Sequence, residues 1–290
     1  MKKEKYAFII NPIAGTKSKA KIQDIAKNIL NSQHTDFFYT ERAGHATELA
    51  TELAAKGYLY VIAVGGDGTI NEVAKGLIHT DTAMGIIPFG SGNGLARHLK
   101  IPLQAKKAIE YLKTAQTTEI DYCKANEKVF FCTCGTGFDA QISYEFARAN
   151  NRGLKTYVQK TLTTYFSYKA QKYRLKTDEL ETEQEAFLIT FANASQYGNN
   201  AYIAPHADLQ DGLLDIAILS KFPLTAIPGL AMQLFSKKIN NSRYMTTLKT
   251  DSVTLHREND GAFHFDGEAD TMPDIIDIKV VRKGLKILAN

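Results

Sequence analysis

The first 120 residues of the chain show two different patterns of apolar and polar positions. Runs that are almost wholly apolar, such as YLYVIAV at residues 58–64, are typical of buried parallel strands. Between these runs, apolar residues recur every three or four positions, as in KAKIQDIAKNIL at 19–30, which predicts helices with one buried face. The repeated succession of strand and helix predicts a Rossmann-like parallel sheet that is covered by helices on both faces.

The pattern assigns these elements to successive segments. The predicted strands cover 6–12, 36–40, 58–64 and 84–90, and the predicted helices cover 19–30, 45–57, 69–78 and 104–113, with a further short helix around Leu95. In open sheets of this kind a ligand binds beyond the carboxyl ends of the strands, so the loops at those ends are where we expect a site.

The pattern of predicted elements changes after Thr117. From there on, short β-rich runs such as AFLITFANAS and GLLDIAIL alternate with Gly, Asn and Asp turns. This pattern predicts a mainly antiparallel, β-sandwich-like second domain, interrupted by helical stretches at 139–174 and 224–235. We therefore expect an α/β domain at 1–120 and a β-rich domain at 121–290. The pattern leaves open whether the last strand returns to the first domain.

Composition narrows the class of protein. Hydrophobic residues make up 44% of the 290 positions, and the net charge of +4 is too small to indicate nucleic acid, for which no binding motif is present. Cys123, Cys132 and Cys134 lack the spacing of a zinc site, so buried thiols in a reducing compartment are expected. The N-terminal apolar run is too short for a signal peptide, and no run reaches the roughly 18 residues of a membrane span. We expect a cytoplasmic protein whose membrane contact, if it has any, is peripheral.

Three glycine-containing loops follow predicted strands: NPIAG (Asn11–Gly15), GGDGTINE (Gly65–Glu72) and PFGSGNG (Pro88–Gly94). Glycine lets a phosphate approach the main chain at a helix N-terminus, although each loop alone is equally compatible with a plain tight turn. None of them is a Walker A loop or a GxGxxG fingerprint. Three such loops at one sheet edge together predict a phosphate site. Thr69 is expected at the N-cap of its helix, and Asp67 could hold magnesium, orient a ribose or help to deprotonate an acceptor.

These loops carry a resemblance to a known family. NPxxG, GGDGTxNE and PxGSGN, in this order, resemble the catalytic domain shared by diacylglycerol kinases, bacterial lipid kinases and sphingosine kinases. NAD kinases and phosphofructokinases have a related GGDG element, but the β-rich second half is more similar to the lipid kinases. The stretches GTGFDA (135–140), APHADLQDGLLDI (204–216) and FDGE (265–268) extend the resemblance over essentially the whole chain. It implies that ATP lies in a cleft between the two domains.

The resemblance also implies which residues contact ATP. They lie in the three loops and at the end of the second strand, where backbone amides and small hydroxyls can surround phosphates. The implied contacts are Asn11, Pro12, Ile13, Ala14, Gly15, Thr40, Gly66, Asp67, Gly68, Thr69, Ile70, Asn71, Glu72 and Ser91.

Three positions of the second half are implied to form a structural magnesium site: the carboxylates of Asp208 and Asp211 and the backbone carbonyl of Leu213. Oxygen donors of this kind suit a hard cation, although DLQDG also fits a solvated turn without metal. Glu268, in FDGE, is implied to be the general base that accepts the proton of the acceptor hydroxyl, and Asp67, the other catalytic residue, is then expected on a magnesium ion or in a hydrogen bond that supports the acceptor. The alternative is that Asp-Gly-Glu is only a hairpin turn.

Two positions bear on the acceptor. The loop that ends in GSGNG lacks an acid that many bacterial lipid kinases have there, because Gly94 has no side chain, and it resembles the corresponding loop of sphingosine kinases. Asp139, in GTGFDA, aligns with an acid that sphingosine kinases use near the lipid headgroup, so the resemblance implies substrate contact. Asp139 also fits an ordinary helix N-cap. The acceptor therefore stays open between diacylglycerol and a sphingoid-type lipid.

Two segments without any acidic residue, 148–177 and 216–250, combine basic side chains with aromatic and apolar ones. Such a mixture suits an anionic lipid headgroup layer, and it also fits an ordinary solvated helix face. Enzymes of the resembled family often pair, so a homodimer is a further expectation. The sequence thus favours an ATP- and Mg²⁺-dependent lipid kinase. The alternatives are a soluble enzyme similar to NAD kinases and a non-catalytic nucleotide or lipid sensor.

Overall fold

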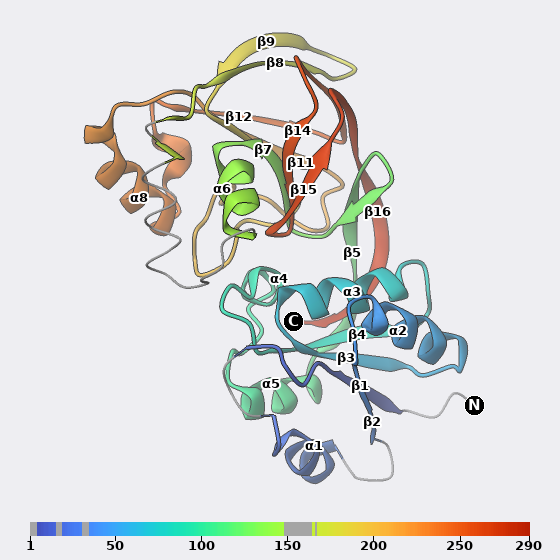
Figure 1. The fold of residues 1–290 in the computed structure, drawn as a ribbon. Helices are drawn as coiled ribbons and strands as arrows, with labels where there is room; N and C mark the ends of the chain where they lie inside the picture. Colours follow the sequence, from blue (N-terminus) through green and yellow to red (C-terminus); the bar gives the residue numbers. More distant parts are fainter. Residues whose placement is uncertain (1–4, 16–18, 31–34, 148–163, 166) are drawn as a thin grey trace. The chain divides into compact units, whose positions relative to one another are not determined.

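The computed structural model describes residues 5–15, 19–30, 35–147, 164–165 and 167–290 (Figure 1). Contacts within the chain divide it into two compact units, Met1–Asp121 together with Arg282–Asn290, and Tyr122–Val281. The chain passes from one unit to the other twice, in strands β5 (Gln116–Ala125) and β16 (Ile275–Ala289).

The first unit contains a parallel sheet whose strands follow the order β2-β1-β3-β4-β16. The residues of β1, β3 and β4 are almost wholly buried, as the apolar runs predict, and Ile287 of β16 pairs in parallel with Met84 of β4. Helices α2 and α3 lie on one face of the sheet, and α1 and α5 lie on the other (Figure 1). The elements of this unit are β1 (Tyr6–Ile10), α1 (Ile22–Leu30), β2 (Thr35–Tyr39), α2 (His45–Ala55), β3 (Tyr60–Gly65), α3 (Asp67–Leu77), β4 (Ala83–Pro88), α4 (Gly94–His98) and α5 (Ala105–Leu112).

The second unit is built mainly from antiparallel strands. Six of them form one sheet in the order β12-β11-β10-β7-β14-β15, and a further layer contains β16, β13, β8 and β9, with β5 pairing β6 and β16. Side chains from both layers fill a common core that includes Phe130, Phe191 and Phe263. The bounds are β6 (Lys128–Phe130), β7 (Thr133–Gly137), α6 (Phe138–Ala147), β8 (Gln171–Lys176), β9 (Glu181–Ala186), β10 (Leu188–Ala192), β11 (Leu214–Leu219), α8 (Ile227–Phe235), β12 (Met245–Thr250), β13 (Ser252–Arg257), β14 (Gly261–Phe265) and β15 (Glu268–Met272).

The predicted fold class, a parallel α/β domain followed by an antiparallel β-sandwich-like domain, is confirmed. The contacts of residues 282–290 belong to the first unit, so the last strand returns there, a point that the sequence left open. Among the described residues, no helix is both long and apolar enough to cross a membrane. The three cysteines are buried, as expected, and none of them forms a disulfide.

One predicted helix is wrong in part. The stretch 139–174 was expected to be helical, but α6 covers only its first residues, and residues 171–174 belong to strand β8. The strand forms because Tyr173 and Leu175 are buried while their neighbours are exposed, which is the two-residue period of a half-buried strand. Most of the basic and aromatic segment between α6 and β8 lies outside the described residues.

Candidate active site

The three glycine loops of the first unit meet at the carboxyl ends of β1, β3 and β4. The Asn11 side-chain amide donates a hydrogen bond of 3.0 Å to the Thr69 hydroxyl, which joins the first loop to the second. Gly66 and Gly90 approach so closely that a Cβ on Gly90 would lie 2.9 Å from the Gly66 Cα. The prediction that these loops share one sheet edge is therefore confirmed for the first unit.

Gly15 shows why the first loop needs glycine. Its φ of +67° lies in the left-handed region, and an added Cβ would lie 1.9 Å from the carbonyl oxygen of Phe89 in the third loop.

Lys19 contacts both the first and the third loop. Its ammonium group bonds the Ala14 carbonyl and lies 4.9 Å from the centre of the Phe89 ring. Partial burial lowers the pKa of Lys19. Sequence reasoning did not single out Lys19.

Asp67 connects the second loop to the third. Its two carboxylate oxygens accept the backbone N–H groups of Asn93 at 2.9 Å and of Gly94 at 2.8 Å, at the start of α4. Asn93 has a left-handed backbone, with φ +51°. The Asp67 carboxylate therefore holds the backbone of the third loop where α4 begins.

The expected N-cap at Thr69 is wrong. Helix α3 begins at Asp67 with Gly66 in the N-cap position, because the Gly66 carbonyl already accepts the N–H of Ile70. Thr69 lies in the first turn and is buried, with its hydroxyl against Asn11.

The Glu72 carboxylate accepts two backbone N–H groups at the start of α2, those of Gly44 at 2.9 Å and of Ala46 at 3.1 Å. Glu72 therefore joins two helices.

The remaining residues implied to contact ATP differ in exposure. Ile13 is 88% exposed at the tip of the first loop, and Ser91 is exposed in the third. Thr40 is buried just beyond β2, where its N–H bonds the Ile10 carbonyl. The side chain of Ile70 is buried, so only its backbone could reach a ligand. The contacts with ATP stay predictions.

In the second unit, Glu268 follows a tight turn. Asp266 and Gly267 have φ values of +50° and +88°, as two-residue turns between antiparallel strands require, so the hairpin anticipated as an alternative is present. The Asp266 carboxylate accepts the backbone N–H groups of residues 131, 132 and 133 at 2.7–2.9 Å. Glu268 is exposed, and no other described residue hydrogen-bonds its carboxylate.

Arg257 fixes the other end of this hairpin. Its guanidinium group donates to the carbonyls of Gly261 at 3.0 Å and Ala262 at 3.1 Å, where β14 begins. It also donates to the carbonyls of Met272 and Pro273, where β15 ends. With Asp266 at the turn and Arg257 at the open end, the strands that carry Glu268 are held at both ends.

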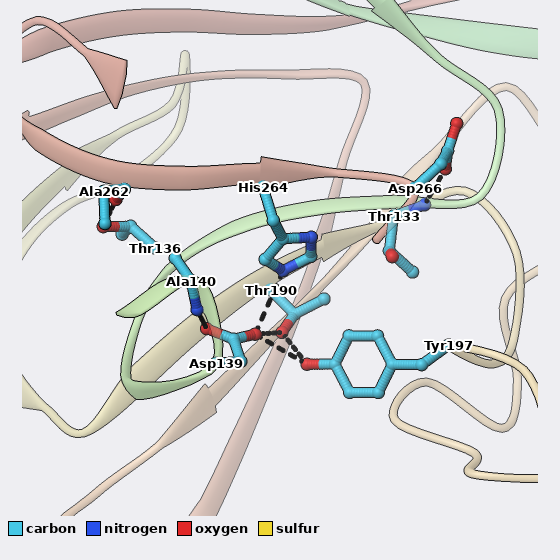
Figure 2. Close-up of polar contacts among 9 residues, drawn as sticks. All are labelled: Thr133, Thr136, Asp139, Ala140, Thr190, Tyr197, Ala262, His264 and Asp266. Carbon is cyan, nitrogen blue, oxygen red and sulfur yellow. Dashed lines mark hydrogen bonds and ion pairs between the residues drawn. The ribbon is translucent and has the colours of Figure 1, made fainter. Parts of the chain in front are cut away.

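Asp139 is the centre of a polar network (Figure 2). Its Oδ2 atom accepts hydrogen bonds from Tyr197 at 2.9 Å, from Thr190 at 3.4 Å and from the Nε2–H of His264 at 3.1 Å. Its Oδ1 atom accepts the N–H of Ala140 at 2.8 Å. The carboxylate identifies Nε2 as the protonated nitrogen. An ordinary N-cap does not describe this residue.

His264 is 3% exposed, and its Nδ1 atom has no hydrogen-bond partner among the described residues. Gly135 makes room for the ring, because a Cβ there would lie 2.9 Å from the His264 Nε2 atom. Sequence reasoning missed His264 and Tyr197. His264 lies between two core phenylalanines of β14, so the sequence pattern gave no sign that its side chain contacts Asp139.

Comparisons with known proteins agree with this arrangement. Residues 5–125 match the diacylglycerol kinase catalytic domain, and residues 132–289 match the YegS C-terminal NAD kinase beta sandwich-like domain. The chain belongs to the diacylglycerol kinase catalytic-domain family.

Members of this family resemble the chain over most of its length. A "Probable lipid kinase YegS-like" protein of Yersinia enterocolitica is 31% identical over 79% of the chain and 78% of its own length. A "Diacylglycerol kinase" of Bacillus subtilis is 29% identical over 90% of the chain and 88% of its own length. The crystal structure of a diacylglycerol kinase from Bacillus anthracis shares the fold, with a TM-score of 0.77 and 22% identity over 99% of the chain and 97% of that structure. The resemblance predicted from the motifs is confirmed.

The magnesium ligands implied by the family resemblance fit a cation only in part. Asp208 and Asp211 are exposed, and each accepts a backbone N–H from its own loop, that of Gln210 and that of Leu213. The second oxygen of Asp211 bonds the Lys249 ammonium at 2.8 Å, which already neutralises this carboxylate. Within the described part of the chain, no group of three or more His, Cys, Asp or Glu residues could hold a metal ion.

Proposed function

We propose that this member of the family is an ATP- and Mg²⁺-dependent kinase that transfers a phosphoryl group to a hydroxyl of a membrane lipid, either diacylglycerol or a sphingoid-type lipid. One observation carries the proposal: the bonds from Asn11 to Thr69 and from Asp67 to Asn93 and Gly94 tie three glycine loops together. Backbone N–H groups beside helix N-termini are suited to phosphates.

Each group has a role that its surroundings support. Asp67 fixes the second and third loops against one another, so that backbone N–H groups are oriented before the nucleotide binds. Glu268 is free of protein partners within the described residues and takes the proton of the lipid hydroxyl. Asp139, which the network of His264 and Tyr197 holds, contributes to the headgroup pocket. Mg²⁺, when bound, neutralises the charge on the transferred phosphoryl group.

The magnesium proposal is open to a test that does not depend on turnover. If Asp208 and Asp211 hold Mg²⁺, the ion would compete with the Lys249 ammonium for the Asp211 carboxylate. We therefore expect Mg²⁺ to raise the melting temperature of the wild type, and to raise it less in Asp208→Asn. An equal rise in both proteins would place the ion elsewhere.

The decisive experiment measures ADP release from ATP and Mg²⁺ against detergent-dispersed diacylglycerol, monoacylglycerol, sphingosine and ceramide, with NAD as a soluble acceptor. Glu268→Gln is the blank, and Glu185→Gln, an exposed glutamate of β9, is the matched control. Turnover on one lipid that is lost only in Glu268→Gln supports the proposal and identifies the acceptor.

Two other outcomes would contradict it. Turnover on NAD alone would indicate a soluble enzyme similar to NAD kinases. Stabilisation by ATP in a thermal melt without ADP formation on any acceptor would indicate a sensor.

A further inference from the structure

Helix α8 of the second unit has an unusual composition for a surface helix. Its nine residues, IPGLAMQLF, include only one polar side chain, Gln233, and none of the nine is buried. A short 3₁₀ turn, Leu224–Ala226, precedes it. Core packing does not explain the exposed part of such an apolar helix, because apolar surface left in water is unfavourable.

The two faces of α8 differ in what they contact. Leu230 and Leu234 pack, partly buried, against an apolar cluster of the second unit. The opposite face carries Met232, 69% exposed, and Phe235, 57% exposed. Leu224, at 44%, lies two turns before Met232 in the chain. These three are among eight large hydrophobic residues that are clearly exposed in the described part of the chain, and they gather within twelve consecutive positions.

The charge around this face has a single sign. Residues 216–250 contain no aspartate or glutamate, and Lys221, Lys238 and Arg243 are exposed on either side of α8 in sequence. A hollow of about 440 Å³ opens between α8 and the segment 241–244, with Arg243 and Gln233 among its lining residues. Apolar side chains flanked by cations match a layer of anionic lipid headgroups above acyl chains.

We propose that the outer face of α8 docks the enzyme on an anionic lipid bilayer, with Met232 and Phe235 entering the acyl boundary and the flanking cations contacting headgroup phosphates. This proposal rests on the proposed function in one respect, which is that the acceptor is a membrane lipid. At about 14 Å the helix is far shorter than the roughly 30 Å hydrocarbon core, so it lies in the interface. A second copy of the chain fits less well, because pairing this face with itself would bring two basic rims together.

The test measures binding to vesicles and needs no turnover. Sedimentation with vesicles of phosphatidylcholine containing phosphatidylglycerol compares the wild type with the double variant Met232→Ser/Phe235→Ser. The matched control is Leu180→Ser/Ile275→Ser, which removes two side chains of 48% exposure elsewhere in the same unit. A third variant, Lys221→Gln/Lys238→Gln, tests the charge. Circular dichroism confirms that all four proteins fold.

We expect the α8 variant to lose at least about tenfold in its partition coefficient, since burying each such side chain is worth more than a factor of ten. The control variant should bind as the wild type does. The lysine variant should weaken binding to anionic vesicles only, and 0.5 M salt should mimic its effect on the wild type.

Three results would overturn the proposal: equal binding of the α8 variant and the wild type, equal binding of the wild type to neutral and anionic vesicles, or a dimer in light scattering that the α8 variant converts to a monomer. Because vesicle binding is independent of phosphoryl transfer, a failure of this proposal and a failure of the proposed kinase reaction remain distinguishable.

Discussion

Asp67 and Gly94 lie 27 positions apart in the chain, yet the Asp67 carboxylate accepts the Gly94 N–H at 2.8 Å. The same carboxylate accepts the N–H of Asn93 at 2.9 Å. A residue that the sequence marks as catalytic is therefore also a structural support for the third loop. Its substitution must affect folding as well as chemistry, and the two effects can be separated.

Replacing Asp67 with Ala should lower the free energy of unfolding by about 1–2 kcal/mol, the usual cost of losing a side chain that bonds the N–H groups of a helix start. Urea unfolding without nucleotide measures this loss. Ser91→Ala, an exposed position in the third loop that Asp67 supports, should change stability by less than about 0.5 kcal/mol. Unchanged stability in Asp67→Ala would mean that the third loop keeps its conformation without this carboxylate.

Gly15→Ala should destabilise the first unit strongly. The left-handed backbone costs about 1–2 kcal/mol for a residue with a Cβ, and contact with the Phe89 carbonyl adds about 1–3 kcal/mol. Gly57→Ala is the control, because its φ is +78° but nothing lies within 4 Å of its added Cβ. Thermal unfolding of the two variants should therefore differ by the packing contribution alone. Equal losses of stability in Gly15→Ala and Gly57→Ala would show that the first and third loops move apart readily to accommodate the added Cβ.

Asp139 and His264 should be energetically coupled. A double-mutant cycle with Asp139→Asn and His264→Phe should give a coupling energy of about 1–3 kcal/mol in urea unfolding, because His264 is buried and donates to the carboxylate. The exposed pair Arg174 and Glu181, 3.6 Å apart, should give a several-fold smaller coupling. A coupling energy as small as that of the exposed pair would indicate that His264 does not hold the Asp139 carboxylate in place.

Asp266 and Glu268 are two residues apart and should behave in opposite ways. Asp266→Ala leaves the N–H groups of residues 131–133 without their acceptor and should cost about 2–4 kcal/mol of stability. Glu268→Gln should leave stability unchanged and lower turnover about 10²- to 10⁴-fold. Combining urea unfolding with the ADP assay checks both. Wild-type turnover in a folded Glu268→Gln protein would exclude this residue as the base.

Asp215 gives a prediction on pH. Burial raises the pKa of its carboxyl, and Lys249, 3.2 Å away, opposes that rise. A raised pKa in the folded state means that the folded protein binds more protons, so this group's contribution to stability falls as pH rises from the unfolded to the folded pKa. Lys249→Met should extend this fall to higher pH. Urea unfolding between pH 4 and 7 measures the slope, and a slope equal to the wild type would contradict the coupling.

The sequence predicted those features that depend on local rules. Apolar runs and helical periodicity identified the strands and most helices, and glycine at strand ends identified the three loops. It could not predict the Asp139–His264 contact, because a histidine between core phenylalanines looks like any strand residue. It also misplaced the start of α3, since the Gly66 carbonyl can begin a helix without a capping side chain. The first failure concerns a contact between residues that are far apart in the chain, and the second concerns backbone geometry.

Strand β16 has a consequence for how the protein is made. Residues 1–121 are synthesised before the second unit, but the strand that covers the β4 edge, through Ile287 and Met84, is synthesised after it. At usual elongation rates this edge stays open for roughly 10–30 s while the intervening residues are translated. An open edge of a buried parallel sheet readily pairs with other nascent chains. The sheet of the first unit is therefore completed only after the second unit has been translated, and a truncation before residue 282 would leave the β4 edge unpaired.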